Sequence, residues 1–147
     1  MCSSDLLEYN TPFAGCGSFP CVEGPANLVF GQTDFSLAVC TSPNTNANNT
    51  CAPVGLAVDG SGNLYVADHI YNRVLEYDNP LAPGGGTPGI PGSAGDTAAD
   101  RVFGQFGSFT SELANNGGIG ADSLDEPEGV ALDTSGNLRG SSAGTKA

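Results

Sequence analysis

Pro53-Val-Gly-Leu-Ala-Val-Asp-Gly-Ser-Gly-Asn-Leu64 recurs as Pro127-Glu-Gly-Val-Ala-Leu-Asp-Thr-Ser-Gly-Asn-Leu138 in this chain of 147 residues. Two further blocks recur in the same order. Val29-Phe-Gly-Gln32 returns as Val102-Phe-Gly-Gln105, and Leu7-Glu-Tyr-Asn10 returns as Leu75-Glu-Tyr-Asp78. Repetition of this kind marks a chain built from copies of one structural unit. The sequence therefore holds two copies of one unit, with the frame cut at both ends.

The repeated blocks predict short β-strands. Residues 54–59 and 64–67 are short apolar runs rich in β-branched and aromatic side chains, and Asp59-Gly-Ser-Gly-Asn63 between them is typical of a tight hairpin turn. Residues 73–78 alternate in the manner of a strand, and residues 101–104 form a fourth, shorter run. We therefore expect an all-β fold with four short antiparallel strands in each unit, which is the pattern of a propeller blade.

The unit resembles the NHL repeat. The residues that carry the resemblance are Pro53-Val-Gly-Leu-Ala-Val-Asp59, Gly62-Asn-Leu-Tyr-Val-Ala-Asp68 and Asn72-Arg-Val-Leu-Glu-Tyr-Asp78. The Phe-Gly-Gln blocks and the long polar connections are similar to the long NHL repeats of bacterial secreted proteins. The resemblance implies a fragment of a β-propeller, with about one complete four-stranded blade and two partial ones, whose neighbouring blades come from a longer chain.

This interpretation divides the chain into five parts. They are the tail of a preceding repeat with the Cys16/Cys21 loop (1–26), an outer strand and inter-blade loop (27–52), a complete blade with a Gly/Pro-rich insertion at 79–100 (53–105), an inter-blade loop and the start of the next repeat (106–138), and a truncated tail outside the repeat (139–147). Residues 1–6 fit either native sequence or an assembly scar. The tail departs from the repeat, and we expect no strand after Leu138.

The charge balance excludes several partners. Sixteen acidic residues face four basic ones, which gives a net charge of −12. Because nucleic acids are bound through clusters of Lys and Arg, this chain is not expected to bind them. No apolar run reaches the roughly 18 residues of a membrane-spanning helix, so no membrane span is expected.

The five cysteines favour an oxidising compartment, meaning an extracellular, cell-surface or periplasmic location. Cys16 and Cys21 are close in sequence, and Cys40 and Cys51 bracket a polar loop. We expect these four to form two disulfides, with free thiols and metal binding as the alternatives.

The connections between strands place the candidate binding residues. The connections between successive antiparallel strands lie alternately at the two ends of the strands. The loop between the second and third strands should therefore lie beside the inter-blade loops, and function concentrates on such loops. The candidate residues are Asp68, His69, Tyr71 and Asn72, with residues 115–118 beside them. The competing interpretation is structural: Asp68 and Asn72 would cap the loop and pair with Arg73, and His69 would be incidental.

No catalytic, cofactor-binding or metal site is expected. A calcium ion at residues 59–63 is a minor alternative, because the turn lacks the later glycine and glutamate of an EF-hand loop. The first hypothesis for function is a non-catalytic scaffold that binds protein or carbohydrate in a secreted or cell-surface protein. The alternative is part of a six-bladed propeller enzyme, similar to metal-dependent lyases and lactonases.

Overall fold

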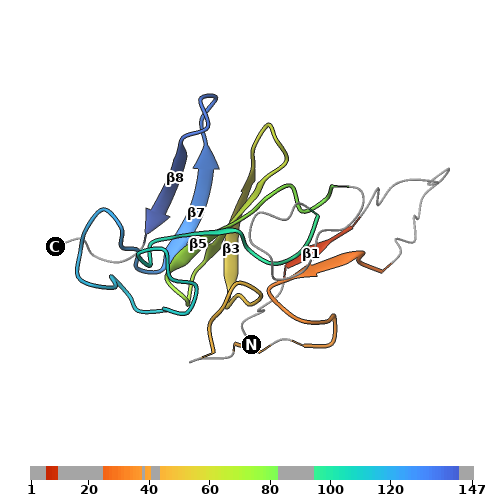
Figure 1. Ribbon diagram of the computed structural model, residues 1–147, viewed down its shortest axis with the longest axis horizontal. Helices are drawn as coiled ribbons and strands as arrows, with labels where there is room; N and C mark the ends of the chain where they lie inside the picture. Colours follow the sequence, from red (N-terminus) through yellow and green to blue (C-terminus); the bar gives the residue numbers. More distant parts are fainter. Residues whose placement is uncertain (1–5, 10–24, 38, 41–43, 83–94, 143–147) are drawn as a thin grey trace.

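The structure is a computed structural model that describes residues 6–9, 25–37, 39–40, 44–82 and 95–142. The described residues form an all-β fold without helices, in which every strand pairing is antiparallel. The eight strands are β1 (Leu6–Glu8), β2 (Leu28–Phe30), β3 (Pro53–Val58), β4 (Leu64–Asp68), β5 (Arg73–Tyr77), β6 (Arg101–Phe103), β7 (Pro127–Leu132) and β8 (Leu138–Ser142). They make one four-stranded sheet and two strand pairs (Figure 1).

The four-stranded sheet has the sequential order β3-β4-β5-β6. The expected hairpin between β3 and β4 is closed by Asp59, whose Oδ1 accepts the backbone N–H groups of Ser61 and Asn63. A side chain that satisfies two backbone donors stabilises such a turn and fixes the register of the strands that follow. The four predicted strands of this segment are therefore confirmed, with bounds that differ by one residue at most.

The two flanking strand pairs repeat the pairings of the central sheet. In β7–β8, Leu132 faces Leu138, as Val58 faces Leu64 in β3–β4, and both pairs carry an irregularity after the first proline. In β1–β2, Leu6 faces Phe30, as Val74 faces Phe103 in β5–β6. The sequence repeat is therefore also a repeat of backbone geometry.

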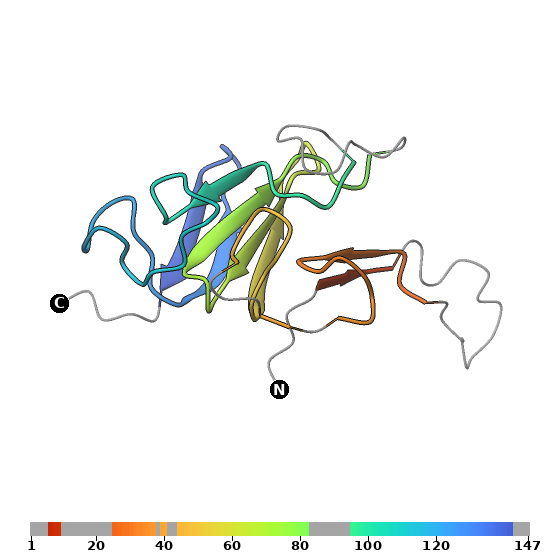
Figure 2. The ribbon, with the colours of Figure 1, turned by 60° about the horizontal axis from the view of Figure 1, so that its bottom comes forward.

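The core lies between the central sheet and the β1–β2 pair. Phe30 of β2 packs with Val66, Leu75 and Tyr77, and the rings of Phe30 and Tyr77 meet edge to face with centroids 5.3 Å apart. β5 is buried along its whole length. Figure 2 shows the β1–β2 pair beside the sheet and the β7–β8 pair on the opposite side.

The β7–β8 pair covers the other face of the sheet through a close backbone approach. A methyl group placed on Gly55 of β3 would lie 2.9 Å from the Cα of Gly129 in β7. Only glycine leaves room for two strands at this separation. The glycine that recurs in the repeated stretch therefore allows the two units to pack together.

The expectation that no strand follows Leu138 is wrong. Residues 138–142 form β8, which pairs with β7 over the full register from Leu138 to Ser142. Arg139-Gly-Ser-Ser has low intrinsic strand propensity, but an already extended partner can override a local preference. Ser142 also exchanges side-chain hydrogen bonds with the backbone of Asp125.

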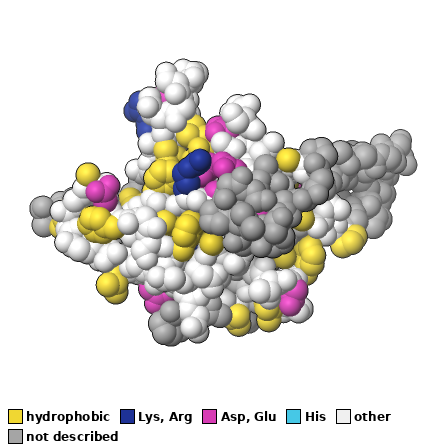
Figure 3. All heavy atoms as spheres, viewed as in Figure 1, with side chains coloured by type: hydrophobic (Ala, Val, Ile, Leu, Met, Phe, Trp, Pro, Cys, Tyr) yellow, Lys and Arg dark blue, Asp and Glu magenta, His cyan; other side chains and the backbone are white. Residues whose placement is uncertain are grey.

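The described residues contain no helix, and therefore none with the length and apolarity needed to cross a membrane. Figure 3 shows one face of the molecule, where hydrophobic side chains form scattered patches among backbone and other side chains, with a few acidic and basic side chains beside them.

Candidate functional site

Three loop segments meet where the chain turns from β4 into β5, along the border of the central sheet formed by the ends of its strands. They are the loop 44–52, the turn 69–72 and the loop 105–126, and we call them together the loop edge. Ile70 N donates a hydrogen bond to Cys51 O at 3.1 Å, which joins the turn to the first loop. As expected from the sequence, the turn between β4 and β5 lies beside the loops that precede β3 and follow β6.

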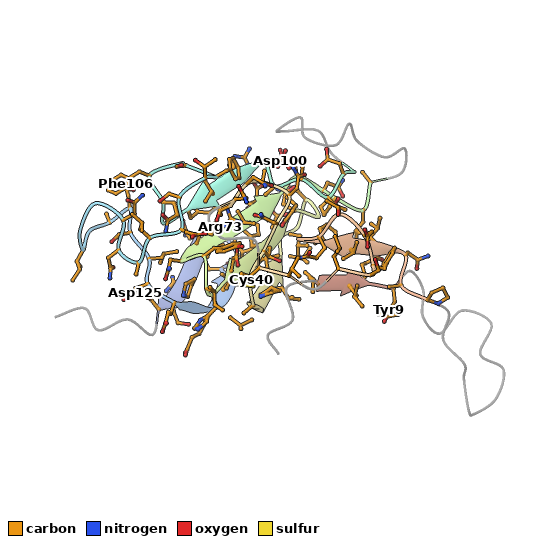
Figure 4. The ribbon with its side chains drawn as sticks, turned by 90° about the horizontal axis from the view of Figure 1, so that it is seen from below. Tyr9, Cys40, Arg73, Asp100, Phe106 and Asp125 are labelled. Atoms are coloured by element: carbon orange, nitrogen blue, oxygen red, sulfur yellow. A yellow bond between two sulfur atoms is a disulfide. The ribbon has the colours of Figure 1, made fainter. Side chains whose placement is uncertain are left out.

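Arg73 ties these segments together from inside the molecule. Its side chain is completely buried at the start of β5 (Figure 4). Nη1 donates to Phe109 O at 2.8 Å, while Nη2 donates to Asn46 O at 3.1 Å and Asn49 O at 2.5 Å. Because a guanidinium carries five donors in one rigid plane, a single residue can hold two separate loops.

Asp68 is the counter-charge of Arg73. Its Oδ2 accepts from Arg73 Nε at 2.8 Å, and its Oδ1 accepts the backbone N–H of Cys51 at 2.7 Å. Burial raises the pKa of Asp68 to about 6, although Arg73 and these hydrogen bonds favour the charged form. The predicted pairing of Asp68 with Arg73 is confirmed.

Asn72 forms a second link between the loops. Its Nδ2 donates to Ile70 O at 3.1 Å and Glu112 O at 2.9 Å, and its Oδ1 accepts the backbone N–H of Glu126 at 2.8 Å. The residue has a positive φ of 53°, a conformation that asparagine tolerates better than most residues. Asn72 therefore caps the turn and holds the loop 105–126 against it.

Tyr71 and His69 complete the predicted set. Tyr71 is buried, with its ring centroid 5.2 Å from the guanidinium carbon of Arg73. His69 is half-buried, and its Nδ1 lies 3.3 Å from Pro127 O. The structure thus brings all four predicted residues to one edge, but it uses Asp68 and Asn72 for internal hydrogen bonds.

Residues 115–118 lie in the third segment of the loop edge. Asn115 N donates to Leu124 O at 2.9 Å, and Gly118 N donates to Asn115 O at 2.7 Å, which closes a compact turn. The Asn115 side chain donates to Asp125 Oδ2 at 3.1 Å. This stretch adjoins the segment that Asn72 holds in place.

Groups that can meet a ligand at the loop edge are supplied by other residues. Asn44 and Asn48 are exposed on the first loop, as is Asn46, whose side chain also makes hydrogen bonds with the backbone of these two neighbours. Ile70 and Leu113 are exposed, with 43% and 63% of their surface accessible. Amides offer both donors and acceptors, and aliphatic side chains offer an apolar contact. The asparagine-rich stretch between Cys40 and Cys51 is the pattern in the sequence from which this surface could have been predicted.

Gln105 is a structural residue that sequence reasoning did not single out. Its side chain is fully buried, and its Nε2 donates to Asn72 O at 2.7 Å and Leu113 O at 3.0 Å. The recurrence of Phe-Gly-Gln in the two repeats was the available signal. Gln105 therefore joins the turn to the third segment.

One of the two expected disulfides falls within the described residues. Cys40 and Cys51 are bonded, with their Cα atoms 5.1 Å apart. The bond closes the loop that carries the exposed asparagines. Cys16 and Cys21 lie outside the described residues, so their pairing stays a prediction.

In the turn 59–63, the Asp59 carboxylate accepts hydrogen bonds from groups of the turn itself. Asp59 Oδ2 accepts from Asn63 Nδ2 at 2.9 Å, while Oδ1 accepts two backbone N–H groups. Burial opposes ionisation, but these hydrogen bonds outweigh it and hold the pKa of Asp59 below its ordinary value. Asp133 makes the same contacts with Ser135 and Asn137 in the second repeat.

Among the residues that the structure describes, no three His, Cys, Asp or Glu side chains are placed to share a metal ion. No protein-family model matches the sequence, and no curated protein is significantly similar to it. The resemblance to the NHL repeat therefore depends on the quoted residues, and it stays a prediction.

Proposed function

We propose that this chain is part of an NHL-type β-propeller and serves as a non-catalytic scaffold whose loop edge binds a protein or carbohydrate ligand. In this proposal residues 53–105 are one blade, and β1–β2 and β7–β8 are parts of the blades on either side. The support for a blade is the sequential antiparallel order of β3–β6, together with the same registers in the two flanking pairs.

The observation that carries the binding role is the buried Arg73 network. Arg73 fixes two loops against the sheet, and Asn72 fixes the turn against the third segment. Loops held by a rigid scaffold lose little conformational entropy when they bind, so less of the interaction energy is lost to ordering. The exposed amides of the first loop suit either hydroxyl groups or peptide groups.

The proposed location is outside the cytoplasm, at the cell surface or in the periplasm or medium. The Cys40–Cys51 disulfide is compatible with this location, because disulfides persist in oxidising compartments. The acidic composition suits a soluble surface that repels nucleic acids and anionic membranes.

Binding is tested on arrays of defined oligosaccharides and defined peptides probed with the labelled chain. Each bound probe is then titrated by biolayer interferometry against Ile70→Asp and against Ser61→Asp. Both variants add one negative charge at an exposed position, but Ser61 lies in the hairpin turn at the opposite edge of the sheet. We expect Kd to rise at least about tenfold for Ile70→Asp and to stay unchanged for Ser61→Asp. An absence of bound probes, or equal effects of the two variants, would refute the binding role.

A further inference from the structure

The two flanking strand pairs are complementary halves of the central sheet. β7–β8 has the register of β3–β4, and β1–β2 has the register of β5–β6. In the central sheet these two kinds of pair are joined through β4 and β5. The β1–β2 pair and the β7–β8 pair are separate, and they lie on opposite sides of the molecule (Figure 1). One chain therefore presents the first half of a sheet at one end and the second half at the other.

Each half has an open strand edge within the described part of the chain. β8 pairs with β7 alone there, and β1 pairs with β2 alone. The corresponding strands of the central sheet, β4 and β5, are bonded on both sides. An open edge presents backbone N–H and C=O groups that can pair with another strand.

An apolar groove lies beside the β1 edge. β1 and β3 line it together, with Leu6, Phe30, Leu56, Val58 and Leu64 among the lining residues. Leu56 and Val58 are 54% and 62% exposed on this face of β3. The groove therefore leaves a hydrophobic sheet face uncovered next to the open edge of β1.

The same chain contains an example of how such a face is covered. On the opposite side of β3, the small residues Gly55 and Ala57 lie against β7, which contributes half-buried Val130 and Leu132. β7 in turn presents its own small residues, Gly129 and Ala131, on its outward face. The outward face of β7 thus corresponds to the face of β3 that is already packed.

We propose that the groove takes the β7–β8 pair of a second copy of this chain. β8 of the second copy would pair with the β1 edge, as β4 pairs with β5, and would complete a four-stranded sheet between two chains. The small outward face of β7 would cover Leu56 and Val58. This inference stands on the strand registers and does not depend on ligand binding at the loop edge.

The charges of the two ends fit this arrangement. In the central sheet Tyr65 of β4 faces Glu76 of β5, and the repeat places Arg139 and Glu8 at the matching positions of β8 and β1. Arg139 has a side chain that is 75% exposed. Glu8 has a buried Oε2 without a hydrogen-bond partner among the described residues. Docking of the second copy would bring these opposite charges together across the new strand pair.

The resulting contact is head to tail. The surface on β1 and β3 differs from the surface on β7 and β8, so each copy keeps one free end after pairing. Such an interface continues until a ring closes or an open chain of copies forms. The association should therefore depend on protein concentration, and its size should exceed a dimer at high concentration.

Charge reversal tests the proposed contact. We expect Glu8→Arg and Arg139→Glu each to weaken self-association about fivefold, because each places like charges opposite one another. An equimolar mixture of the two variants should restore it, since each contact between unlike variants then joins opposite charges. Sedimentation velocity at about 0.15 M salt over a hundredfold concentration range measures this, with long-range repulsion between the acidic chains screened.

Substitutions that block one of the two contact surfaces provide an independent test. Leu56→Asp should block the groove and Ala131→Arg the outward face of β7, so each variant alone should remain a single chain. Their mixture should stop at a heterodimer, because only one pair of intact ends is left. Leu113→Asp, an exposed apolar position on the loop edge, is the matched control and should associate like the wild type. Far-ultraviolet circular dichroism checks that each variant keeps its β-structure.

The outcomes separate clearly. A wild-type chain that keeps the mass of one copy throughout the range would overturn the proposal. A mixture of charge variants that associates no better than its components would also overturn it, because the Glu8–Arg139 contact would then not exist. Equal weakening by Leu56→Asp and Leu113→Asp would show that the groove is not the contact surface.

Discussion

Arg73 Nε and Asp68 Oδ2 are 2.8 Å apart, and both side chains are completely buried between the end of β4 and the start of β5. Desolvation offsets much of the attraction in a buried ion pair, so the pair itself contributes little net stability. What distinguishes this pair is that the remaining guanidinium donors bind carbonyl groups of two loops. Its main effect is therefore to fix the loop edge to the sheet.

Replacement of the guanidinium should be costly even when the charge is kept. Arg73→Lys preserves a cation beside Asp68 but cannot satisfy the carbonyl groups of Asn46, Asn49 and Phe109 together. We expect the free energy of unfolding to fall by about 2–4 kcal/mol, because buried acceptors would lose their donors. Urea unfolding followed by circular dichroism measures the change.

The matched control for this prediction is Arg139→Lys. Arg139 is exposed, and its Nη2 lies 3.3 Å from Asp133 Oδ2, so its replacement should change the free energy of unfolding by less than about 0.5 kcal/mol. Similar losses for the two lysine variants would show that the Arg73 network does not hold the loops.

Stability should decrease as the pH rises through neutrality. Burial raises the pKa of Glu76 to about 7, the nearby Asp78 carboxyl adds to the increase, and Arg101 opposes it. A carboxyl group whose folded-state pKa exceeds its unfolded value binds more protons in the folded state. Its stabilisation is thus present at low pH and is lost as the pH passes the folded-state pKa. We expect a loss of roughly 1–2 kcal/mol between about pH 5 and pH 8.

Glu76→Gln isolates this contribution. The variant should show a flatter dependence of unfolding free energy on pH over the same range. Asp133→Asn is the control, because hydrogen bonds from Asn137 and Ser135 lower the pKa of Asp133 to about 2, well outside the range. Stability that rises toward pH 8, or an unchanged slope in Glu76→Gln, would contradict the prediction.

The strands from Pro53 to Tyr77 could be predicted because their information is local. Alternating apolar residues define the strands, and the Asp59 turn defines the register. β8 could not be predicted, because its residues have weak strand propensity and its pairing with β7 determines the conformation.

The roles of the candidate site residues were only partly predictable. The pairing of Asp68 with Arg73 follows from their nearness on adjacent strands. The burial of Asn72 depends on contacts with Glu112 and Glu126, which lie 40 and 54 residues away in the sequence. No local pattern contains such contacts, so a residue that looked available for a ligand is used to hold a loop.

The Cys40–Cys51 disulfide should stabilise the loop edge. A bond between cysteines 11 positions apart reduces the conformational entropy of the unfolded chain, which stabilises the folded state by roughly 3 kcal/mol. We expect the double variant Cys40→Ser/Cys51→Ser to lose about 2–4 kcal/mol in urea unfolding, while Cys2→Ser loses nothing measurable. An unchanged stability of the double variant would contradict a bonded pair.

Thiol counting extends this test to the predicted Cys16–Cys21 bridge. If both bridges form, alkylation of the denatured, non-reduced protein should label one of the five cysteines. Mass spectrometry then identifies the labelled residue, which should be Cys2. Labelling of Cys16 and Cys21 would exclude the second bridge and leave the Cys40–Cys51 result untouched.

The recurring glycine of the Phe-Gly-Gln blocks should be irreplaceable for two separable reasons. Gly104 has a φ of +94°, and a methyl group on it would lie 2.6 Å from the Leu124 side chain. Gly107 has a φ of +75° with open space around it, and Gly60 has open space and no positive φ.

Alanine at Gly60 should change the stability little, and alanine at Gly107 should cost about 1–2 kcal/mol from backbone strain alone. Gly104→Ala should cost about 2–4 kcal/mol, because Leu124 must also move. Urea unfolding of the three variants under identical conditions gives the order, and equal losses at Gly104 and Gly107 would rule out the packing contribution of Leu124.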